Sequence, residues 1–284
     1  MLKRLKTRAL AGAALACLFL SACASANKTL TKETLVESRK SMAADDFETA
    51  LDNFKEARKK NPESTDLTAN YIRMVEEIKR TADGARSRGE YARAGRIYRI
   101  LLDRYSDFGA FAEKLTFKKA QLETPLKECR IEAVYDPAAQ AMKAGQFTKA
   151  IDIFRAALKE NPRDADLAAK FRGTANEIKA IGDKALDNKD FARAGTVNVF
   201  LLRSYASFEG LKPPVAFTRE VLREAVGACR ESLTRTGLAE YRNGNLAKAI
   251  AIWEDLLSFD PDNAEIKKAV TTARTQLKEL KKKE

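Results

Sequence analysis

The stretch Phe47-x-x-Ala50-x-x-x-Phe54-x-x-Ala57-x-x-x-x-Pro62 decides the fold of this chain. A small residue, an aromatic residue four positions later and another buried residue three positions further lie on one face of an α-helix. The small alanine allows a neighbouring helix to approach closely, and the aromatic ring fills the space beyond it. The proline then ends the helix. The stretch therefore predicts a helix that packs closely against a neighbour.

The same spacing occurs twice more along the chain. It recurs 100 residues later at Phe147, Ala150, Phe154, Ala157 and Pro162, and again at Leu246, Ala249, Trp253, Leu256 and Pro261. This spacing resembles the second helix of the tetratricopeptide repeat (TPR), which carries alanine, a large residue, alanine or leucine, and proline at these offsets. The resemblance implies an all-α, TPR-like helical-repeat solenoid in which neighbouring repeats bury each other's apolar faces.

A longer module is also duplicated. Residues 45–130 and 145–230 align without a gap, with shared features such as Asn61-Pro62 and Asn161-Pro162. A partial third copy follows, so the solenoid over 32–284 is predicted to hold modules at about 32–130, 131–232 and 233–284. The apolar periodicity predicts helices over about 31–44, 47–60, 91–105, 112–123, 215–243 and 262–281, with Pro137 as a kink or a restart. After Pro62 it also predicts a long helix of about 25 residues, with an apolar stripe from Leu67 to Ala85.

The N-terminus has the features of an export signal. Residues 1–8 carry four positive charges, and residues 9–20 are apolar but too short to span a bilayer comfortably. The run ends in Leu20-Ser21-Ala22-Cys23, which resembles the lipobox of bacterial lipoproteins. The resemblance implies a signal peptide over 1–22, diacylglycerol and palmitate on Cys23, and a lipidated tether over 23–31.

The lipobox resemblance also implies a location. The residue after Cys23 is Ala24 and not aspartate, which by resemblance to proteobacterial sorting favours the outer membrane, facing the periplasm. Ordinary signal cleavage at Ala22-x-Ala24 or Ala24-x-Ala26 is the alternative, and it would give a periplasmic protein without a lipid anchor.

The chain is basic, with a formal net charge of +12. Removal of the signal peptide takes away four of the 52 basic residues, so 48 basic against 40 acidic residues leave about +8. This excess raises a second hypothesis, a binder of anionic polymer or lipid. Nucleic acid is not an expected partner of an exported protein.

Composition argues against catalysis and against bound cofactors or metals. Histidine is absent, and the four cysteines lack the spacing of a zinc cluster. Neither a nucleophile motif nor a glycine-rich phosphate loop is present. We therefore predict a protein that is not an enzyme. Cys129 and Cys229 occupy equivalent places, and the geometry of helix packing favours buried free thiols over a disulfide between them.

Two groups of residues are candidates for partner binding. The expected inner face of the first helices carries Arg39, Met42, Tyr135, Met142, Leu238 and Tyr241. Such a face suits an amphipathic helix or an extended peptide, although these side chains could instead pack against the next repeat. Arg93 and Arg193 are retained in both copies, either for a repeated anion contact or for an inherited salt bridge.

These observations predict a membrane-anchored periplasmic scaffold or adaptor lipoprotein. It would bind another protein of the cell envelope during assembly, secretion or export, without a small-molecule substrate. The alternative is the binder of anionic polymer or lipid.

Overall fold

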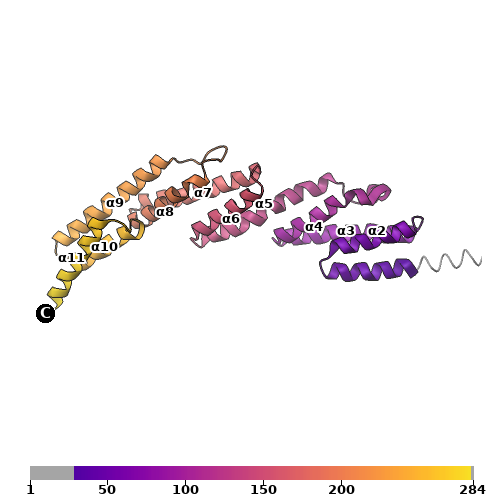
Figure 1. The fold of residues 1–284 in the computed structure, drawn as a ribbon, viewed down its shortest axis with the longest axis horizontal. Helices are drawn as coiled ribbons and strands as arrows, with labels where there is room; N and C mark the ends of the chain where they lie inside the picture. The colour runs from indigo at the N-terminus through magenta and orange to yellow at the C-terminus, as the bar shows by residue number, and fades with distance from the viewer. Residues whose placement is uncertain (1–28, 283–284) are drawn as a thin grey trace, which may run out of the picture. The chain divides into compact units, whose positions relative to one another are not determined.

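The computed structural model describes residues 29–282 of the chain. Within this range the regular structure is helical and no β-strand is present. The chain divides between Ala133 and Val134 into two compact units, here called unit 1 and unit 2. Neighbouring helices pack against each other within each unit (Figure 1), which confirms the all-α helical-repeat prediction.

Unit 1 begins with a helix over residues 29–43. It continues with α2 (Phe47–Lys60), α3 (Thr65–Ser87), α4 (Tyr91–Asp103), the 3-10 segment η1 (Tyr105–Lys114) and the first part of α5 (Ala120–Lys143). Its core is rich in aromatic rings: Phe54 stacks on Tyr71 with ring centroids 5.2 Å apart, and Phe108 meets the edge of the same ring. These contacts join α2, α3 and η1.

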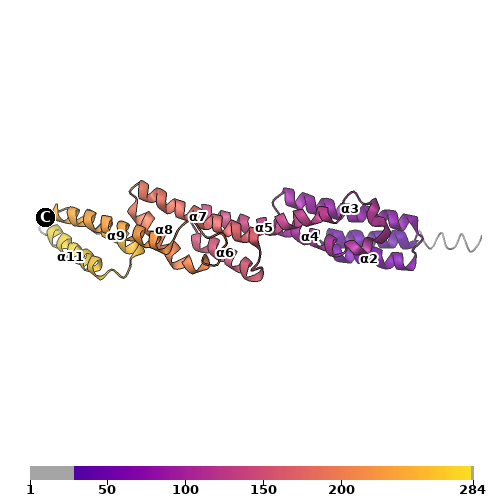
Figure 2. The ribbon, with the colours of Figure 1, turned by 90° about the horizontal axis from the view of Figure 1, so that it is seen from above.

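Unit 2 contains the rest of α5 and the helices that follow it. These are α6 (Phe147–Glu160), α7 (Ala165–Asp187), α8 (Phe191–Ser204), the short η2 (Tyr205–Ser207), α9 (Arg219–Arg242), α10 (Leu246–Phe259) and α11 (Ala264–Lys281). Helix α9 contacts both α8 and α10, and α10 packs in turn on α11 (Figures 1 and 2).

Side chains fix where several helices begin. The carboxylate of Asp46 accepts a hydrogen bond from the backbone N–H of Thr49, so it caps α2. Ser64 and Asp164 cap α3 and α7 in the same way, by accepting from the N–H three residues later. Such caps satisfy N–H groups that the first turn of a helix leaves unpaired.

The duplication extends to the lengths of the helices and to individual contacts. Helices α2, α6 and α10 each have 14 residues, and α3 and α7 each have 23. The Phe154–Phe171 stack in unit 2 has the same 5.2 Å spacing as its counterpart in unit 1. The hydroxyl of Tyr105 donates to the Phe117 carbonyl at 3.5 Å, and that of Tyr205 donates to the Phe217 carbonyl at 3.4 Å.

One local prediction was wrong, and one alternative of another is excluded. The helix expected over 112–123 is instead η1, a bend, and the start of α5 at Ala120. Gly109 has a positive φ of 52°, which interrupts the helical path, and Phe111 is buried against Tyr71. Pro137 was expected to be a kink or a restart; a restart is excluded because α5 runs through this residue, and the kink stays a prediction. Pro137 is exposed, so water can reach the carbonyl that loses its helical donor.

The two cysteines in the repeats are buried and free, as predicted. Burial raises the pKa of the Cys229 thiol to about 11 and also raises that of Cys129. Both thiols are therefore protonated at neutral pH and serve as small apolar side chains in the helix packing.

Unit 2 contains two places where only glycine fits between helices. A Cβ atom added to Gly195 on α8 would lie 2.6 Å from the ring of Phe259 on α10. A Cβ atom on Gly237 of α9 would collide with the buried ring of Trp253. In contrast, a Cβ atom on Gly227 of α9 would meet no atom within 4 Å. The α8–α10 and α9–α10 contacts thus depend on the absence of a Cβ atom at Gly195 and Gly237.

We expect Gly195→Ala to destabilise the protein, because Phe259 is buried and must move to admit the methyl group. Overpacking of this kind costs about 1–3 kcal/mol. The matched control is Gly227→Ala, which places a better helix former in an open position and should stabilise by about 0.5–1 kcal/mol. Urea unfolding followed by circular dichroism measures both variants. Equal midpoints for the two variants would contradict the tight α8–α10 contact.

Candidate protein-binding site

A hollow of about 540 Å³ lies in unit 1 between the helix over residues 29–43 and α3. We call it the α3 groove. Leu35 and Ile72 supply apolar surface, and the exposed guanidinium groups come from Arg39, Arg73 and Arg80. Arg73 and Arg80 are seven residues apart, so they share one face of α3.

Two of the acidic residues that line the α3 groove, Glu76 and Asp83, already bind other side chains of unit 1. The Glu76 carboxylate accepts hydrogen bonds from the Thr116 backbone N–H at 2.6 Å and from the Thr116 hydroxyl at 2.7 Å. Lys79 pairs with Asp83 at 2.7 Å. By contrast, Arg39 and Arg80 have no ion-pair partner within residues 29–282. The α3 groove can therefore offer guanidinium donors to a carboxylate, beside apolar surface.

The predicted partner-binding residues of the first helices fall into two groups. Arg39 lines the α3 groove, and Leu238 is exposed on α9. The others are half-buried and pack against the hydrophobic cores of their units: Met42, Tyr135, Met142 and Tyr241. For these four side chains the structure shows helix packing, and a role in binding stays a prediction.

Two of the half-buried aromatic residues have defined neighbours in unit 2. The ammonium group of Lys170 lies 3.9 Å from the centre of the Tyr135 ring, a cation–π contact between α7 and α5. The ring of Tyr241 lies 5.7 Å from that of Trp253, which joins α9 to α10. Both contacts join neighbouring helices of the repeat.

Arg93 of α4 forms a salt bridge to Asp45 in the turn before α2 of unit 1. Its guanidinium grips the Asp45 carboxylate with two hydrogen bonds, of 2.8 Å from Nε and 2.7 Å from Nη2, and also contacts Glu90 at 3.0 Å. The Arg93 hydrogen bond lowers the pKa of Asp45. Hydrogen bonds from Arg88 and then from Arg93 lower the pKa of Glu90 to about 2. Of the two interpretations of Arg93, a salt bridge within the protein and an anion contact with a partner, the structure shows the salt bridge.

Arg193 does not repeat this arrangement. The residue equivalent to Asp45 is Gly145, and the Arg193 side chain is exposed without an ion pair in the described part of the chain. The salt bridge therefore does not account for Arg193, and its role in partner binding stays a prediction.

The sequence analysis did not identify Arg73 and Arg80 as candidates. Their seven-residue spacing on one predicted helix is the signal that could have found them. The sequence predicted a helix over about 31–44 but could not show that this helix lies beside Arg73 and Arg80, which makes their surface one side of a groove.

Residues 29–282 contain neither a metal-binding cluster nor a helix that could span a membrane. No cluster of three or more cysteine, aspartate or glutamate side chains there could hold a metal ion. None of the helices in this range has the length and apolar character needed to cross a membrane.

We expect Arg93→Gln to lower stability at pH 7, whereas the matched control Arg193→Gln should leave it unchanged. Water screens a pair this exposed, so the loss should be about 0.2–1 kcal/mol. The folded-state pKa of Asp45 lies below its ordinary value of 3.8. The carboxylate therefore stabilises the fold above that value, and its contribution disappears as the pH falls through the lowered pKa. Urea unfolding at pH 7 and pH 3 measures the difference.

Comparison with known families identifies one repeat directly. A family model described as tetratricopeptide repeat matches residues 231–263, which comprise the second part of α9, all of α10 and the turn after it. A search of curated proteins found no match to the chain. The matched segment contains Gly237 and Trp253, the tightly packed pair between α9 and α10. The chain therefore contains a tetratricopeptide repeat within an all-α helical-repeat fold, which typically acts as a non-enzymatic protein-interaction scaffold.

Proposed function

We propose that this protein is a lipid-anchored adaptor of the bacterial envelope, and that it binds another protein through the α3 groove. The proposal that it binds a protein rests on the α3 groove. In this groove Arg39 and Arg80 lack ion-pair partners within residues 29–282 and lie beside apolar surface. The tetratricopeptide repeat at 231–263 supports protein partners in general.

The proposed anchor is Cys23, which lies outside the described residues, as do the proposed signal peptide over 1–22 and most of the tether over 23–31. The support for it is the sequence: a basic start, an apolar run and the Leu20-Ser21-Ala22-Cys23 box. Residues 29–31 of the proposed tether are helical. The outer membrane, on its periplasmic side, is the proposed location because Ala24 follows the cysteine.

The proposed mechanism needs no chemical step. Several acyl chains hold a protein stably at a membrane. Anchoring in this way raises the effective concentration of the α3 groove for a partner in the same compartment. A guanidinium offers paired N–H donors in a plane, a geometry that matches a carboxylate. The partner segment would therefore place an acidic side chain at Arg39 or Arg80 and an apolar one near Leu35 and Ile72.

The alternative, a binder of anionic polymer or lipid, has less support. Many cations in the described helices are already paired with acids, for example Lys55 with Asp107 at 2.9 Å, Arg86 with Glu128 at 3.0 Å and Arg230 with Asp260 at 2.7 Å. Internal pairing reduces the field that these cations offer to an external polyanion.

Lipidation predicts that replacing one thiol changes the location of the protein. The unmodified chain should sediment with membranes and incorporate labelled palmitate, whereas Cys23→Ala should lose the label and leave the membrane fraction. Cys17→Ala is the matched control, because it removes a thiol from the apolar run without changing the box. Fractionation with palmitate labelling measures both. A labelled Cys23→Ala protein, or an unlabelled unmodified chain, would refute the anchor.

Partner binding through the α3 groove predicts that charge reversal there lowers the recovery of a partner. Arg39→Glu combined with Arg80→Glu should reduce at least tenfold the amount of protein crosslinked to the chain in envelope membranes. The control is Arg99→Glu combined with Arg163→Glu, which makes the same change of charge at exposed residues outside the groove. Quantitative mass spectrometry of the crosslinked material gives the readout. Equal recovery with both double variants would remove the groove from the proposal.

A further inference from the structure

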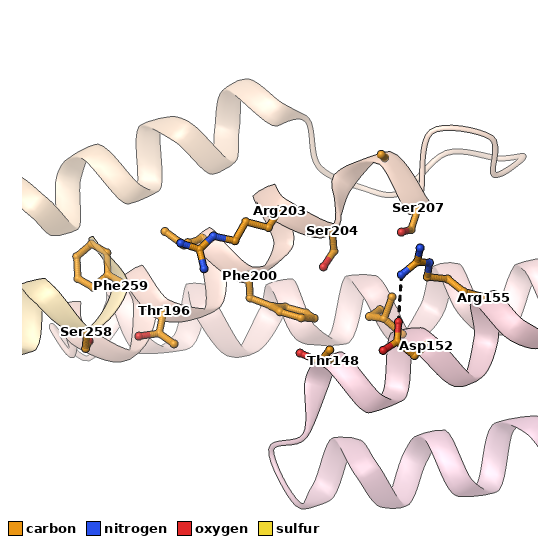
Figure 3. A pocket seen from close by; sticks show the side chains of 13 residues that line it. Thr148, Asp152, Arg155, Thr196, Phe200, Arg203, Ser204, Ser207, Ser258 and Phe259 are labelled. Atoms are coloured by element: carbon orange, nitrogen blue, oxygen red, sulfur yellow. Dashed lines mark hydrogen bonds and ion pairs between the residues drawn. The ribbon is translucent and has the colours of Figure 1, made fainter. Parts of the chain in front are cut away.

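Unit 2 has a hollow of about 490 Å³ formed by α6, α8, η2 and α10 (Figure 3). We call it the α8 hollow, and none of its lining residues belongs to the α3 groove. Asp152 and Arg155 extend from α6, and their ion pair of 3.1 Å is the dashed line in Figure 3. Ser204 and Ser207 lie across the hollow from them, and Phe200 lies between α8 and α6.

The duplicated module offers an internal comparison for this hollow. At the equivalent positions of unit 1, four charged side chains form a continuous chain of ion pairs, here called the ion network. Arg104 contacts Asp52 at 3.0 Å and Asp107 at 3.6 Å, and Lys55 contacts Asp107 at 2.9 Å. The central members of this network are Arg104 and Asp107. Their counterparts in unit 2 are Ser204 and Ser207.

The replacement of the two central residues by serine removes both bulk and charge pairing. A serine side chain is far shorter than arginine or aspartate, so it cannot bridge α8 to α6. In unit 2 the remaining charged pair, Asp152 and Arg155, is mostly exposed. The α8 hollow thus occupies the place that an ion network fills in the other copy of the module.

The sign of the charge around the site is also reversed. Position 103 of unit 1 is aspartate, and its counterpart in unit 2 is Arg203. Together with the four residues of the network, Asp103 gives this site in unit 1 three acidic and two basic side chains, a net charge of −1. The same five positions in unit 2 carry one acid against two bases, a net charge of +1. The α8 hollow therefore favours an anionic ligand, whereas its counterpart is internally neutralised.

Several donors in the α8 hollow are available to such a ligand. Within residues 29–282, Arg203 has no ion-pair partner, and the hydroxyl groups of Ser204 and Ser207 have no hydrogen-bond partner. A carboxylate can accept from a guanidinium and from hydroxyl groups at the same time. Figure 3 shows the Arg203 side chain extending toward Phe259 and away from Ser207, so a carboxylate held by the two hydroxyl groups also binds Arg203 once this exposed side chain changes rotamer.

An apolar hollow of about 780 Å³ adjoins the polar one and shares Phe200 with it. Phe147 and Ile153 also line this second hollow, and the rings of Phe147 and Phe200 are 5.9 Å apart. Aromatic residues and arginine are enriched where proteins bind each other most strongly. A small inorganic anion would leave this apolar surface uncovered, whereas a peptide can cover it.

We propose that the α8 hollow and its apolar neighbour bind an acidic peptide segment of a partner protein, with a carboxylate at Arg203, Ser204 and Ser207 and a bulky apolar side chain against Phe147 and Phe200. This site goes beyond the proposed function, because the helices that form it are not those of the α3 groove. The failure of one site leaves the other untouched.

The test uses the full chain in detergent micelles and a blocked, fluorescein-labelled peptide that alternates glutamate with phenylalanine and leucine. A second peptide carries glutamine in place of every glutamate. Fluorescence anisotropy should show that the acidic peptide binds at least tenfold more tightly than its glutamine counterpart. Absence of binding by the acidic peptide, or equal affinity for both peptides, would overturn the proposal.

The decisive variant rebuilds the ion network of unit 1 inside unit 2. Ser204→Arg combined with Ser207→Asp adds one charge of each sign, so the net charge of the chain does not change while the hollow is filled. Affinity for the acidic peptide should fall at least tenfold, and a thermal melt verifies that the variant folds. Arg203→Asp installs the residue that unit 1 carries and should cause the same loss without filling the hollow. Unchanged affinity in both variants would overturn the proposal.

Two controls separate this site from the rest of the chain. Arg104→Ser combined with Asp107→Ser opens the network of unit 1, again without a change in net charge, and should leave peptide affinity within twofold of the unmodified chain. Arg39→Glu with Arg80→Glu, which alters the α3 groove, should also leave it within twofold. A tenfold loss in either control would place the peptide elsewhere and overturn the proposal.

Discussion

The fold depends on the contact between a large ring on one helix and the residues that make room for it on its neighbours. In unit 1, Phe54 of α2 stacks on Tyr71 of α3, and in unit 2, Phe154 of α6 stacks on Phe171 of α7. In the last repeat, Trp253 of α10 instead packs against a glycine of α9. A helix of 14 residues is barely stable alone in water, so these buried contacts, and not helix propensity, hold the hairpins together.

The sequence was sufficient for features that depend on spacing along the chain. The positions of Phe54, Phe154 and Trp253 predicted a packed helix in each copy, and equivalent places for Cys129 and Cys229 predicted buried thiols. The same reasoning failed between Tyr105 and Ala120, where the path is set by burial of Phe111 and by the positive φ of Gly109. Helical periodicity carries no information about such a segment, because its aromatic residues are buried without a regular helix.

The candidate sites show a second limit of sequence reasoning. Helical spacing places a residue on a face, but a groove exists only where two elements face each other. Arg39 was identified from its position on the first helix, while its neighbours across the α3 groove were missed. The α8 hollow is harder still to predict, because it exists where the short side chains of Ser204 and Ser207 leave the space that arginine and aspartate fill in unit 1. Comparison of the two copies makes it visible: the same helices carry the ion network in one unit and unpaired donors in the other.

Helix α9 has a consequence for how this chain can be cut. Its 24 residues contact α8 as well as α10, so this one helix belongs to two successive hairpins. The segment that matches the tetratricopeptide family begins at residue 231, in the middle of the helix. A fragment excised at the family boundary would lose Cys229 and Val226 from its core and would expose the α9 surface that α8 covers. The unit recognised in the sequence is therefore smaller than the unit that folds, and expression boundaries belong before α8, which covers that surface and begins at Phe191.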